Sequence, residues 1–407
     1  QPAAEENYTR HVDPKIGTGG HGHVFVGANV PFGMVQVGPT SIPQTWDWCS
    51  GYHASDSTVI GFSHTHLSGT GIGDLFDITV MPVVGEVTYA RGEENDPASG
   101  LWSYADRTRE ITKPGYYSVP LVRYGITAEL TATERVGLHR YTFPASDAAA
   151  VVFDLENGGC WDKATDTGFR FSDDSTRIAG WRCSTGWAKN QEVYFVAEFS
   201  KPAKGISYLQ PGEIDDSKMP RIAARYARVD FDTAEGEQVL VKVALSPVSI
   251  EGAKANLAAE LSGWDFDATA AAADKAWNDE LSKVKIETED ETSKRIFYTA
   301  LYHTMVAPSL FCDVNGDYRG ADGKVHENPG HDTYTTFSLW DTYRAAMPLM
   351  TVLHPERMPD IIQTMLHIAD EQGRLPVWHL WGNETDCMVG NPGIPVVADA
   401  IVKGIGG

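Results

Sequence analysis

Two segments near the end of the sequence place carboxylates beside indole rings. The residue types that could do chemistry there are Trp340, Asp341, Arg344, Trp381, Glu384 and Asp386. Carboxylates bind neighbouring hydroxyls through paired hydrogen bonds, and an indole face packs against the apolar face of a pyranose ring. The pattern therefore predicts a sugar-binding pocket. The alternative interpretation is a capped helix beside a buried aromatic cluster.

A third segment, Trp46-Asp-Trp-Cys-Ser-Gly-Tyr-His53, brings two indoles, a carboxylate and an imidazole together within eight residues. Trp46 and Trp48 could form an aromatic platform for a sugar. A packed bend with buried tryptophans explains the same pattern equally well, so both interpretations stay open at this point.

Histidine pairs occur in two glycine-rich segments, His21 with His23 and His64 with His66. The first pair could bind a metal. Zinc is possible at the second pair, but no cysteine or carboxylate lies there at the spacing of a structural zinc site. We expect the first pair to be loop histidines bound to backbone carbonyls. We expect the second pair, which alternates as in a strand, to form a hydrogen-bonded domain interface.

The elements that must position these residues change type near residue 250. Residues 1–250 alternate apolar and polar side chains in short runs separated by Gly, Pro and Asp, which predicts an antiparallel β-sandwich. The clearest predicted strands are Tyr116–Arg123, Ile126–Thr133, His139–Phe143, Ala149–Phe153, Gln191–Phe199 and Gln238–Ser246. Residues 251–285 have helical spacing and predict a linker of one or two helices.

Residues 286–407 are predicted to be mainly helical. We expect helices over Thr292–Met305, over Leu339–Leu353 across Pro348, and over Met358–Glu371 with Gly373 ending the last one. Asp341 then lies at the N-terminal end of a helix, where the helix dipole stabilises a carboxylate. Between these helices, Asp313–Gly320 contains an Asn-Gly pair that favours a hairpin turn over a calcium loop, because Lys324 stands where a calcium loop has Glu.

Composition narrows the class of protein. The formal charge is 33 − 55 = −22, which disfavours nucleic acid and anionic membranes as partners. No apolar run is long enough to predict a membrane span. The chain begins with Gln1 rather than Met, so we expect an exported protein, periplasmic or extracellular, after removal of a signal peptide. In such a compartment Cys160 could pair with Cys183.

Seven segments in order along the chain resemble the successive motifs of glycoside hydrolase family 92. They are Val12-Asp-Pro-Lys-Ile-Gly-Thr-Gly-Gly-His-Gly-His23, Pro31-Phe-Gly-Met34, Ser50-Gly-Tyr-His53, Gly61-Phe-Ser-His-Thr-His-Leu-Ser-Gly-Thr-Gly71, Phe337-Ser-Leu-Trp-Asp-Thr-Tyr-Arg344, His354-Pro-Glu-Arg357 and Trp381-Gly-Asn-Glu-Thr-Asp-Cys387. Any one of them alone would be weak, but together they are specific.

The resemblance implies a β-sandwich (residues 1–250), the helical linker (251–285) and the first part of an (α/α)6 barrel (286–407). It implies inverting exo-hydrolysis of terminal α-linked mannose from mannose-rich glycans such as N-glycans, assisted by Ca²⁺. Asp341 would bind the terminal mannose, Trp46 or its rival Trp48 would line the neighbouring subsite, and Glu384 and Asp386 would line the pocket.

The family's acid, base and calcium motifs do not occur in this sequence. We therefore expect the acid and base beyond residue 407, on a second polypeptide or a longer chain, and we expect residues 1–407 alone to be inactive. No residue of the chain is assigned as a metal ligand. If the chain alone were active, Glu384 with Asp341 or Asp386 would be the catalytic pair. Other classes left open are another secreted exo-glycosidase, including a phosphorylase, and a non-catalytic carbohydrate-binding protein.

Overall fold

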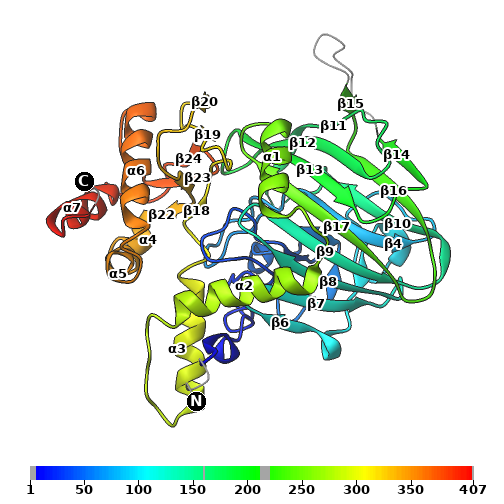
Figure 1. Cartoon of the computed structure of the whole chain (residues 1–407), viewed down its shortest axis with the longest axis horizontal. Coiled ribbons are helices and arrows are strands. Elements are labelled where there is room, and N and C mark those ends of the chain that lie inside the picture. Colours follow the sequence, from blue (N-terminus) through cyan, green and yellow to red (C-terminus); the bar gives the residue numbers. More distant parts are fainter. Residues whose placement is uncertain (1–5, 159–160, 211–220, 406–407) are drawn as a thin grey trace.

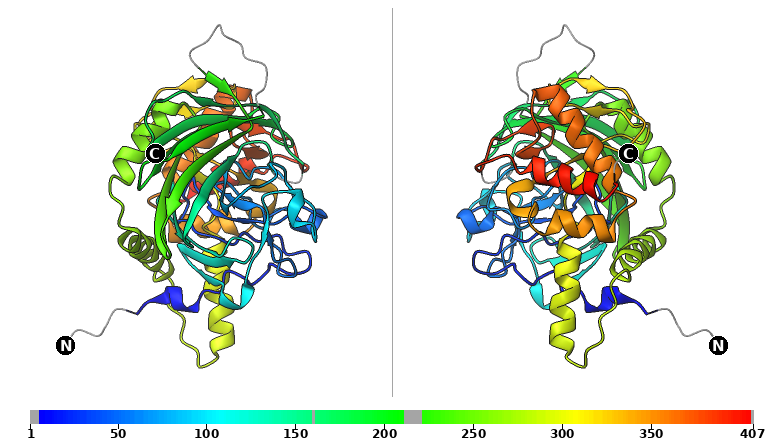
Figure 2. Two further views of the ribbon diagram at one scale, coloured as in Figure 1. Left: turned by 90° about the vertical axis from the view of Figure 1, so that its right-hand side faces the viewer. Right: turned by 90° about the vertical axis from the view of Figure 1, so that its left-hand side faces the viewer.

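The computed structural model describes residues 6–158, 161–210 and 221–405. An antiparallel, β-rich part comes first and helices follow it, which confirms the predicted order of the two classes of structure (Figure 1). Helices α4 to α7 lie to one side of the sheets in Figure 1 and in front of them in the right-hand view of Figure 2.

The larger sheet has nine antiparallel strands, joined mostly as neighbours in sequence. Its order is β15 (Arg221–Ala223), β11 (Lys163–Arg170), β12 (Arg177–Thr185), β13 (Gln191–Phe199), β17 (Glu237–Ser246), β9 (Val136–Phe143), β8 (Ile126–Ala132), β7 (Tyr116–Leu121) and β6 (Ile111–Lys113). Strand β12 alternates buried and half-buried residues, as expected where one face of a strand meets a core.

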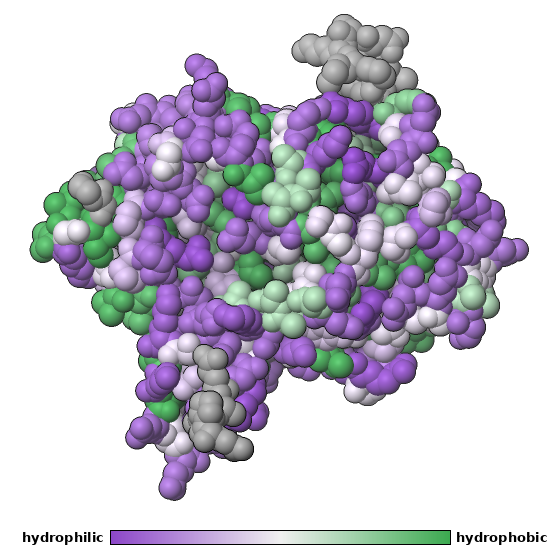
Figure 3. All heavy atoms as spheres, viewed as in Figure 1, coloured by the Kyte–Doolittle hydropathy of each residue, from purple (hydrophilic) through white to green (hydrophobic). Residues whose placement is uncertain are grey.

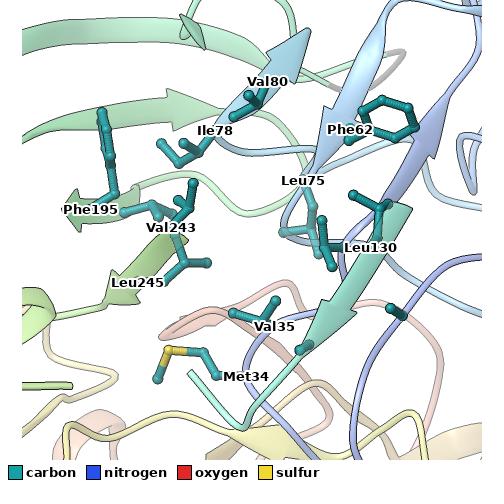
Figure 4. Packing of buried hydrophobic residues seen from close by; sticks show 14 of the residues in the cluster. Met34, Val35, Phe62, Leu75, Ile78, Val80, Leu130, Phe195, Val243 and Leu245 are labelled. Atoms are coloured by element: carbon teal, nitrogen blue, oxygen red, sulfur yellow. The ribbon is translucent and has the colours of Figure 1, made fainter. Parts of the chain in front are cut away.

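The smaller sheet has six strands and packs against the larger one. Its order is β1 (Gly38–Thr40), β3 (Gly61–Ser63), β4 (Thr79–Val84), β10 (Ser146–Asp154), β16 (Tyr226–Thr233) and β14 (Gly205–Leu209). Val80 of this sheet and Phe195 and Val243 of the larger sheet belong to one buried cluster (Figure 4). Burial of these apolar surfaces between the sheets is the main stabilising contribution to this part.

The six predicted strands are confirmed as β7, β8, β9, β10, β13 and β17. The strands outside the two main sheets are short. They form the small pairs β2 (Thr58–Val59) with β5 (Ser103–Tyr104), β18 (Ser309–Leu310) with β21 (Tyr334–Thr335), and β19 (Tyr318–Arg319) with β20 (Val325–His326), and the sheet β22 (Phe337–Ser338), β23 (Trp378–Leu380), β24 (Asn383–Glu384). Short 3₁₀ turns are η1 (Tyr8–His11), η2 (Trp46–Trp48), η3 (Pro97–Ser99) and η4 (Arg107–Arg109).

The helical structure predicted for residues 251–285 is confirmed by two helices, α1 (Ile250–Glu260) and α2 (Phe266–Leu281). Ser249 and Asp265 cap them, because each side chain accepts a hydrogen bond from a backbone N–H of the first turn. The predicted hairpin turn is also confirmed: Gly316 has a φ of 91° and its N–H donates to the carbonyl of Asp313.

The helical part contains α3 (Glu291–His303), α6 (Met358–Gln372), which ends at Gly373 as predicted, and α7 (Gly393–Val402). The single helix predicted over Leu339–Leu353 is wrong. It is divided into α4 (Leu339–Thr342) and α5 (Ala346–Leu353). Pro348 is the third residue of α5, where a missing backbone N–H costs little, so the proline belongs to the start of a helix rather than its middle.

Apolar side chains are exposed on the helices farthest from the sandwich. They include Leu349 and Val352 of α5, Leu366 of α6, and Ile394, Ile401 and Val402 of α7. Figure 3 shows hydrophobic residues gathered at this end of the molecule. No helix in the described part of the chain is both long and apolar enough to cross a membrane.

Candidate active site

A cleft of about 160 Å³ lies between the β-rich part and the helices. One wall is the loop Ser68–Thr70, which belongs to the glycine-rich segment that contains His64 and His66. The opposite wall comes from β22, α4, α5 and β23, together with the end of α3. The residues lining it on that side include His303, Thr304, Ser338, Asp341, Thr342, Met347, Met350 and Trp378.

Asp341 is exposed and lines this cleft. The Ser338 hydroxyl donates a hydrogen bond to its Oδ2 at 2.5 Å. Strand pairing between Ser338 and Trp378 holds this corner beside β23. Because α4 has only four residues, its dipole contributes little, and the carboxylate is held mainly by this serine. Asp341 can therefore accept hydrogen bonds from hydroxyl groups of a ligand in the cleft.

Trp46 and Trp48 have different surroundings, although they are two residues apart. Trp46 is 49% exposed, and its Nε1 donates to the carbonyl of Gly71 at 2.8 Å. The Trp48 ring stacks on His53 at 4.3 Å, and its Nε1 donates to Asp56. Gly71 directly follows the loop that lines the cleft, so Trp46 is the ring placed next to that wall.

Asp47, between the two tryptophans, binds both histidines of the first pair. Its Oδ1 lies 2.6 Å from His21 Nδ1 and 3.2 Å from His23 Nε2. The expectation of backbone-carbonyl partners for these histidines is wrong, because folding brings the η2 carboxylate to them. The edge of the His23 ring also contacts Trp46, with the ring centroids 4.2 Å apart.

Glu384 is engaged by the backbone around it. Its two carboxylate oxygens accept hydrogen bonds from the N–H groups of Val377, Trp378 and Asp386, at 2.9 to 3.1 Å, and from the Gln372 amide. These bonds hold the start of β23, and hence Trp378, against the cleft. This arrangement supports a positioning role for Glu384 rather than proton transfer.

The other predicted pocket residues lie outside the cleft lining. Asp386 is exposed and forms an ion pair with Arg374. Trp381 is 2% exposed, with its ring edge against Phe311. Arg344 is stacked on the ring of Trp340, 4.8 Å from its centroid, and donates to the Trp340 carbonyl. The six residues singled out at the start thus include one cleft-lining carboxylate.

The second histidine pair is buried inside the β-rich part. His64 Nδ1 contacts the Ile78 carbonyl and its Nε2 contacts His139, while His66 Nδ1 contacts the Gln36 carbonyl. Burial lowers the pKa of His64 to about 4, so the ring is neutral at pH 7 and both its nitrogens take part in hydrogen bonds. The expected hydrogen bonds are present, but they lie within the sandwich and not between domains.

Trp378, an indole beside the predicted carboxylates, and His303, which was not predicted, also line the cleft. Trp378 packs at its edge against Trp187 with centroids 4.5 Å apart, and His303 ends α3 beside the cleft. Burial lowers the pKa of His303 to about 4, and its Nε2 has no hydrogen-bond partner among the described residues. Trp378 stood beside the predicted carboxylates, but His303 had no local sequence signal.

The pairing of Cys160 with Cys183 lies outside the described residues.

Two groups of three potential metal ligands occur in the described part of the chain, Glu280–His354–Glu356 and Asp322–His326–Glu371. Neither group lines the cleft. Each contains an imidazole nitrogen, whereas Ca²⁺ prefers oxygen ligands throughout. In the first group the Lys283 ammonium already contacts both glutamates. The donor sets present here do not fit calcium.

Comparison with known proteins identifies relatives over nearly the whole chain. A fungal protein of Arthroderma benhamiae, described as an uncharacterized secreted glycosidase, is 25% identical over 433 residues, covering 98% of this chain and 50% of its own. The solved structure of a family GH92 α-mannosidase from Bacteroides thetaiotaomicron, in complex with mannoimidazole, superposes with a TM-score of 0.92 at 38% identity, covering 98% of this chain and 53% of that one.

A second structure, of a family GH92 inverting mannosidase from Bacteroides thetaiotaomicron, gives a TM-score of 0.85 at 28% identity, covering 98% of this chain and 54% of that one. The chain thus spans about half the length of the relatives that it matches. The model of the glycosyl hydrolase family 92 N-terminal domain matches residues 11–246, and that of the family's catalytic domain matches residues 252–407. The chain belongs to glycoside hydrolase family 92.

Proposed function

We propose that this chain forms part of an exported exo-α-mannosidase that removes terminal α-linked mannose from mannose-rich glycans with inversion. The observation that carries the proposal is the cleft between the two parts of the molecule, with the Asp341 carboxylate on one wall and Trp46 next to the other. Family membership and the α-mannosidases among the structural relatives support the substrate class. The secreted relative supports export.

The cleft residues suit recognition of a terminal sugar. The carboxylate of Asp341 would accept hydrogen bonds from hydroxyl groups of the terminal mannose, and the hydroxyl of Ser338 fixes its orientation. The buried Trp378 lines the cleft from the side of β23. Trp46, exposed beside Gly71, would stack against the sugar that becomes the leaving group.

The catalytic acid and base are proposed to lie outside these 407 residues. An inverting hydrolase needs two carboxyl groups about 6.5–9.5 Å apart, one to protonate the leaving oxygen and one to activate water. Among the predicted carboxylates, Glu384 is engaged by backbone N–H groups and Asp386 by Arg374, which leaves Asp341 as a binding group. In the solved relatives the part without a counterpart here belongs to the same chain, so they give no support for a separate second polypeptide.

The proposed domain division is 1–250, 251–285 and 286–407, with the last part contributing the first helices of an (α/α)6 barrel. The exposed apolar side chains of α5, α6 and α7 support this, because further helices packed there would bury them. Calcium assistance is proposed only with ligands from outside the described residues, since the donor sets found here do not fit it.

The test uses the complete protein and a set of p-nitrophenyl and disaccharide α-mannosides. We expect hydrolysis that releases β-mannose as the first product, which proton NMR of the anomeric signal detects. We also expect chelation of divalent cations to abolish the activity and added Ca²⁺ to restore it. Retention of the α-anomer would contradict inversion. We expect residues 1–407 alone to show no turnover. Robust turnover by that piece would direct attention back to Glu384 with Asp341 or Asp386.

A further inference from the structure

Tryptophan exposure singles out two positions in the described part of the chain. The residues Trp46 and Trp161 are 49% and 45% exposed, whereas every other tryptophan is buried or only half-buried. An exposed indole presents a large apolar face to water, which is unfavourable unless a ligand covers it. The two exposed rings are therefore the natural places to look for sugar contacts.

Both residues attach to the same short loop. The Trp46 Nε1 donates to the carbonyl of Gly71 at 2.8 Å, and the backbone N–H of Trp161 donates to the carbonyl of Gly73 at 3.0 Å. Residues Ser68–Thr70 of this loop line the cleft. Along the chain, the loop thus passes from the cleft to the contact with Trp46 and then to the contact with Trp161.

The backbone that carries Trp161 is anchored in the interior. The next residue, Asp162, is buried and accepts hydrogen bonds from the guanidinium of Arg182 at 2.9 and 3.2 Å. The same guanidinium binds Asp77 at 2.7 Å, at the other end of the loop that lines the cleft. One buried arginine therefore fixes both the loop and the base of Trp161, so the ring stands on a preorganised support.

We propose that Trp161 is a second aromatic platform, beyond Trp46, which binds the third sugar of an oligomannose chain counted from its terminal mannose. This inference rests on the proposed function. The terminal mannose occupies the cleft at Asp341, the second sugar lies on Trp46, and the third reaches Trp161, in the order in which the loop meets these groups. Trp161 then determines preference for longer substrates and takes no part in the chemical step.

The test compares kcat/KM of the complete protein for α-linked mannobiose and mannotriose. We expect Trp161→Ala to lower the ratio of mannotriose to mannobiose kcat/KM by about tenfold, since an aromatic stacking contact is worth roughly one factor of ten. Trp161→Phe, which keeps an aromatic face, should restore most of the ratio. The matched control is Phe171→Ala, another exposed aromatic side chain, 58% exposed just after β11; it should leave the ratio unchanged.

The outcomes separate this inference from the proposed function. Wild-type protein that hydrolyses neither substrate would overturn the proposed function and this inference with it. Activity in the wild type with an unchanged ratio in Trp161→Ala would overturn only the role of Trp161. An equal loss on both substrates would also overturn it, because a ring that contacts the third sugar alone cannot affect the disaccharide.

Discussion

The two walls of the cleft are held by different kinds of interaction. On the sandwich side, the Arg182 guanidinium is completely buried and binds Asp77 and Asp162, which ties the cleft loop to the core. On the helical side, Asp341 is exposed on a four-residue helix, and one serine hydroxyl orients it. The sandwich thus supplies a wall anchored in the core, while the helices supply the exposed carboxylate that we propose meets the ligand.

The same contrast holds for the apolar surfaces. The sheets enclose Val80, Phe195 and Val243 completely, whereas α5 and α7 expose residues such as Val352 and Val402. A sandwich closes its core with two layers, but a single row of helices has one open face. The exposed apolar side chains of α5 and α7 support the proposal that further helices pack on this side.

The largest expected effect is on the stability of the sandwich wall. Replacing Arg182 by Met removes the buried cation that pairs with the carboxylates of Asp77 and Asp162, so the free energy of unfolding should fall by about 3–5 kcal/mol. Urea denaturation measures it. Arg170→Met, which removes an exposed pair with Glu251, is the control and should cost less than about 1 kcal/mol. Equal effects of the two substitutions would contradict the proposed rigidity of this wall.

On the helical wall we expect a large effect on activity with little change in stability. Asp341→Asn should lower kcat/KM for an aryl α-mannoside by roughly a hundredfold, because a charged hydrogen bond to the substrate is lost. The melting temperature should stay within a few degrees of wild type. Asp386→Asn should stay within about threefold of wild-type activity, since that carboxylate contacts Arg374 at the surface. A larger loss of activity in Asp386→Asn than in Asp341→Asn would instead support the sequence-based prediction that Asp386 lines the pocket.

A substitution of Glu384 tests whether this carboxylate positions Trp378 or acts as a catalytic acid or base. Glu384→Gln places an amide among backbone N–H groups that need acceptors, so the free energy of unfolding should fall by about 1–3 kcal/mol. The kcat/KM should decline only because Trp378, which these hydrogen bonds position, shifts in the cleft. A loss of several thousandfold with unchanged stability would instead identify Glu384 as the acid or base.

The smallest expected effect is a pH dependence of the sandwich. Burial raises the pKa of the Asp74 carboxyl to about 6, above its ordinary value near 4. Between pH 4 and 6 the unfolded chain loses this proton while the folded protein keeps it, so stability falls as pH rises, by on the order of 1 kcal/mol. Asp74→Asn should remove this part of the slope in denaturation curves. An unchanged slope would show that Asp74 is ionised in the folded protein at pH 5.

Much of the fold could be predicted from local patterns. Strand β13 has the predicted bounds, Gln191–Phe199, because alternation of buried and exposed residues leaves one workable register. Helix α6 ends at Gly373, whose φ of 86° suits glycine. The break between α4 and α5 was missed, because apolar spacing continues across it and only the position of Pro348 marks the second start.

Which of the candidate side chains line a common cleft could not be predicted from the sequence. Sequence proximity grouped Asp341 with Glu384 and Asp386, but hydrogen bonds from the backbone engage Glu384 and leave Asp341 facing the cleft. The spacing of Trp46 and Trp48 in the sequence could not show which of the two lies beside the cleft. Their difference depends on the carbonyl of Gly71 and on the ring of His53, which lie elsewhere in the sequence.

By itself, the sequence determined the family, the change from strands to helices near residue 250, and the presence of carboxylates and indoles suited to a sugar. These are properties of residue type and spacing along the chain. Only the tertiary structure decided which of those side chains reach a common cleft, and it added His303 and placed Trp161 beside the cleft loop. The reason is physical: exposure and hydrogen-bond partners depend on contacts between distant segments, which no local pattern encodes.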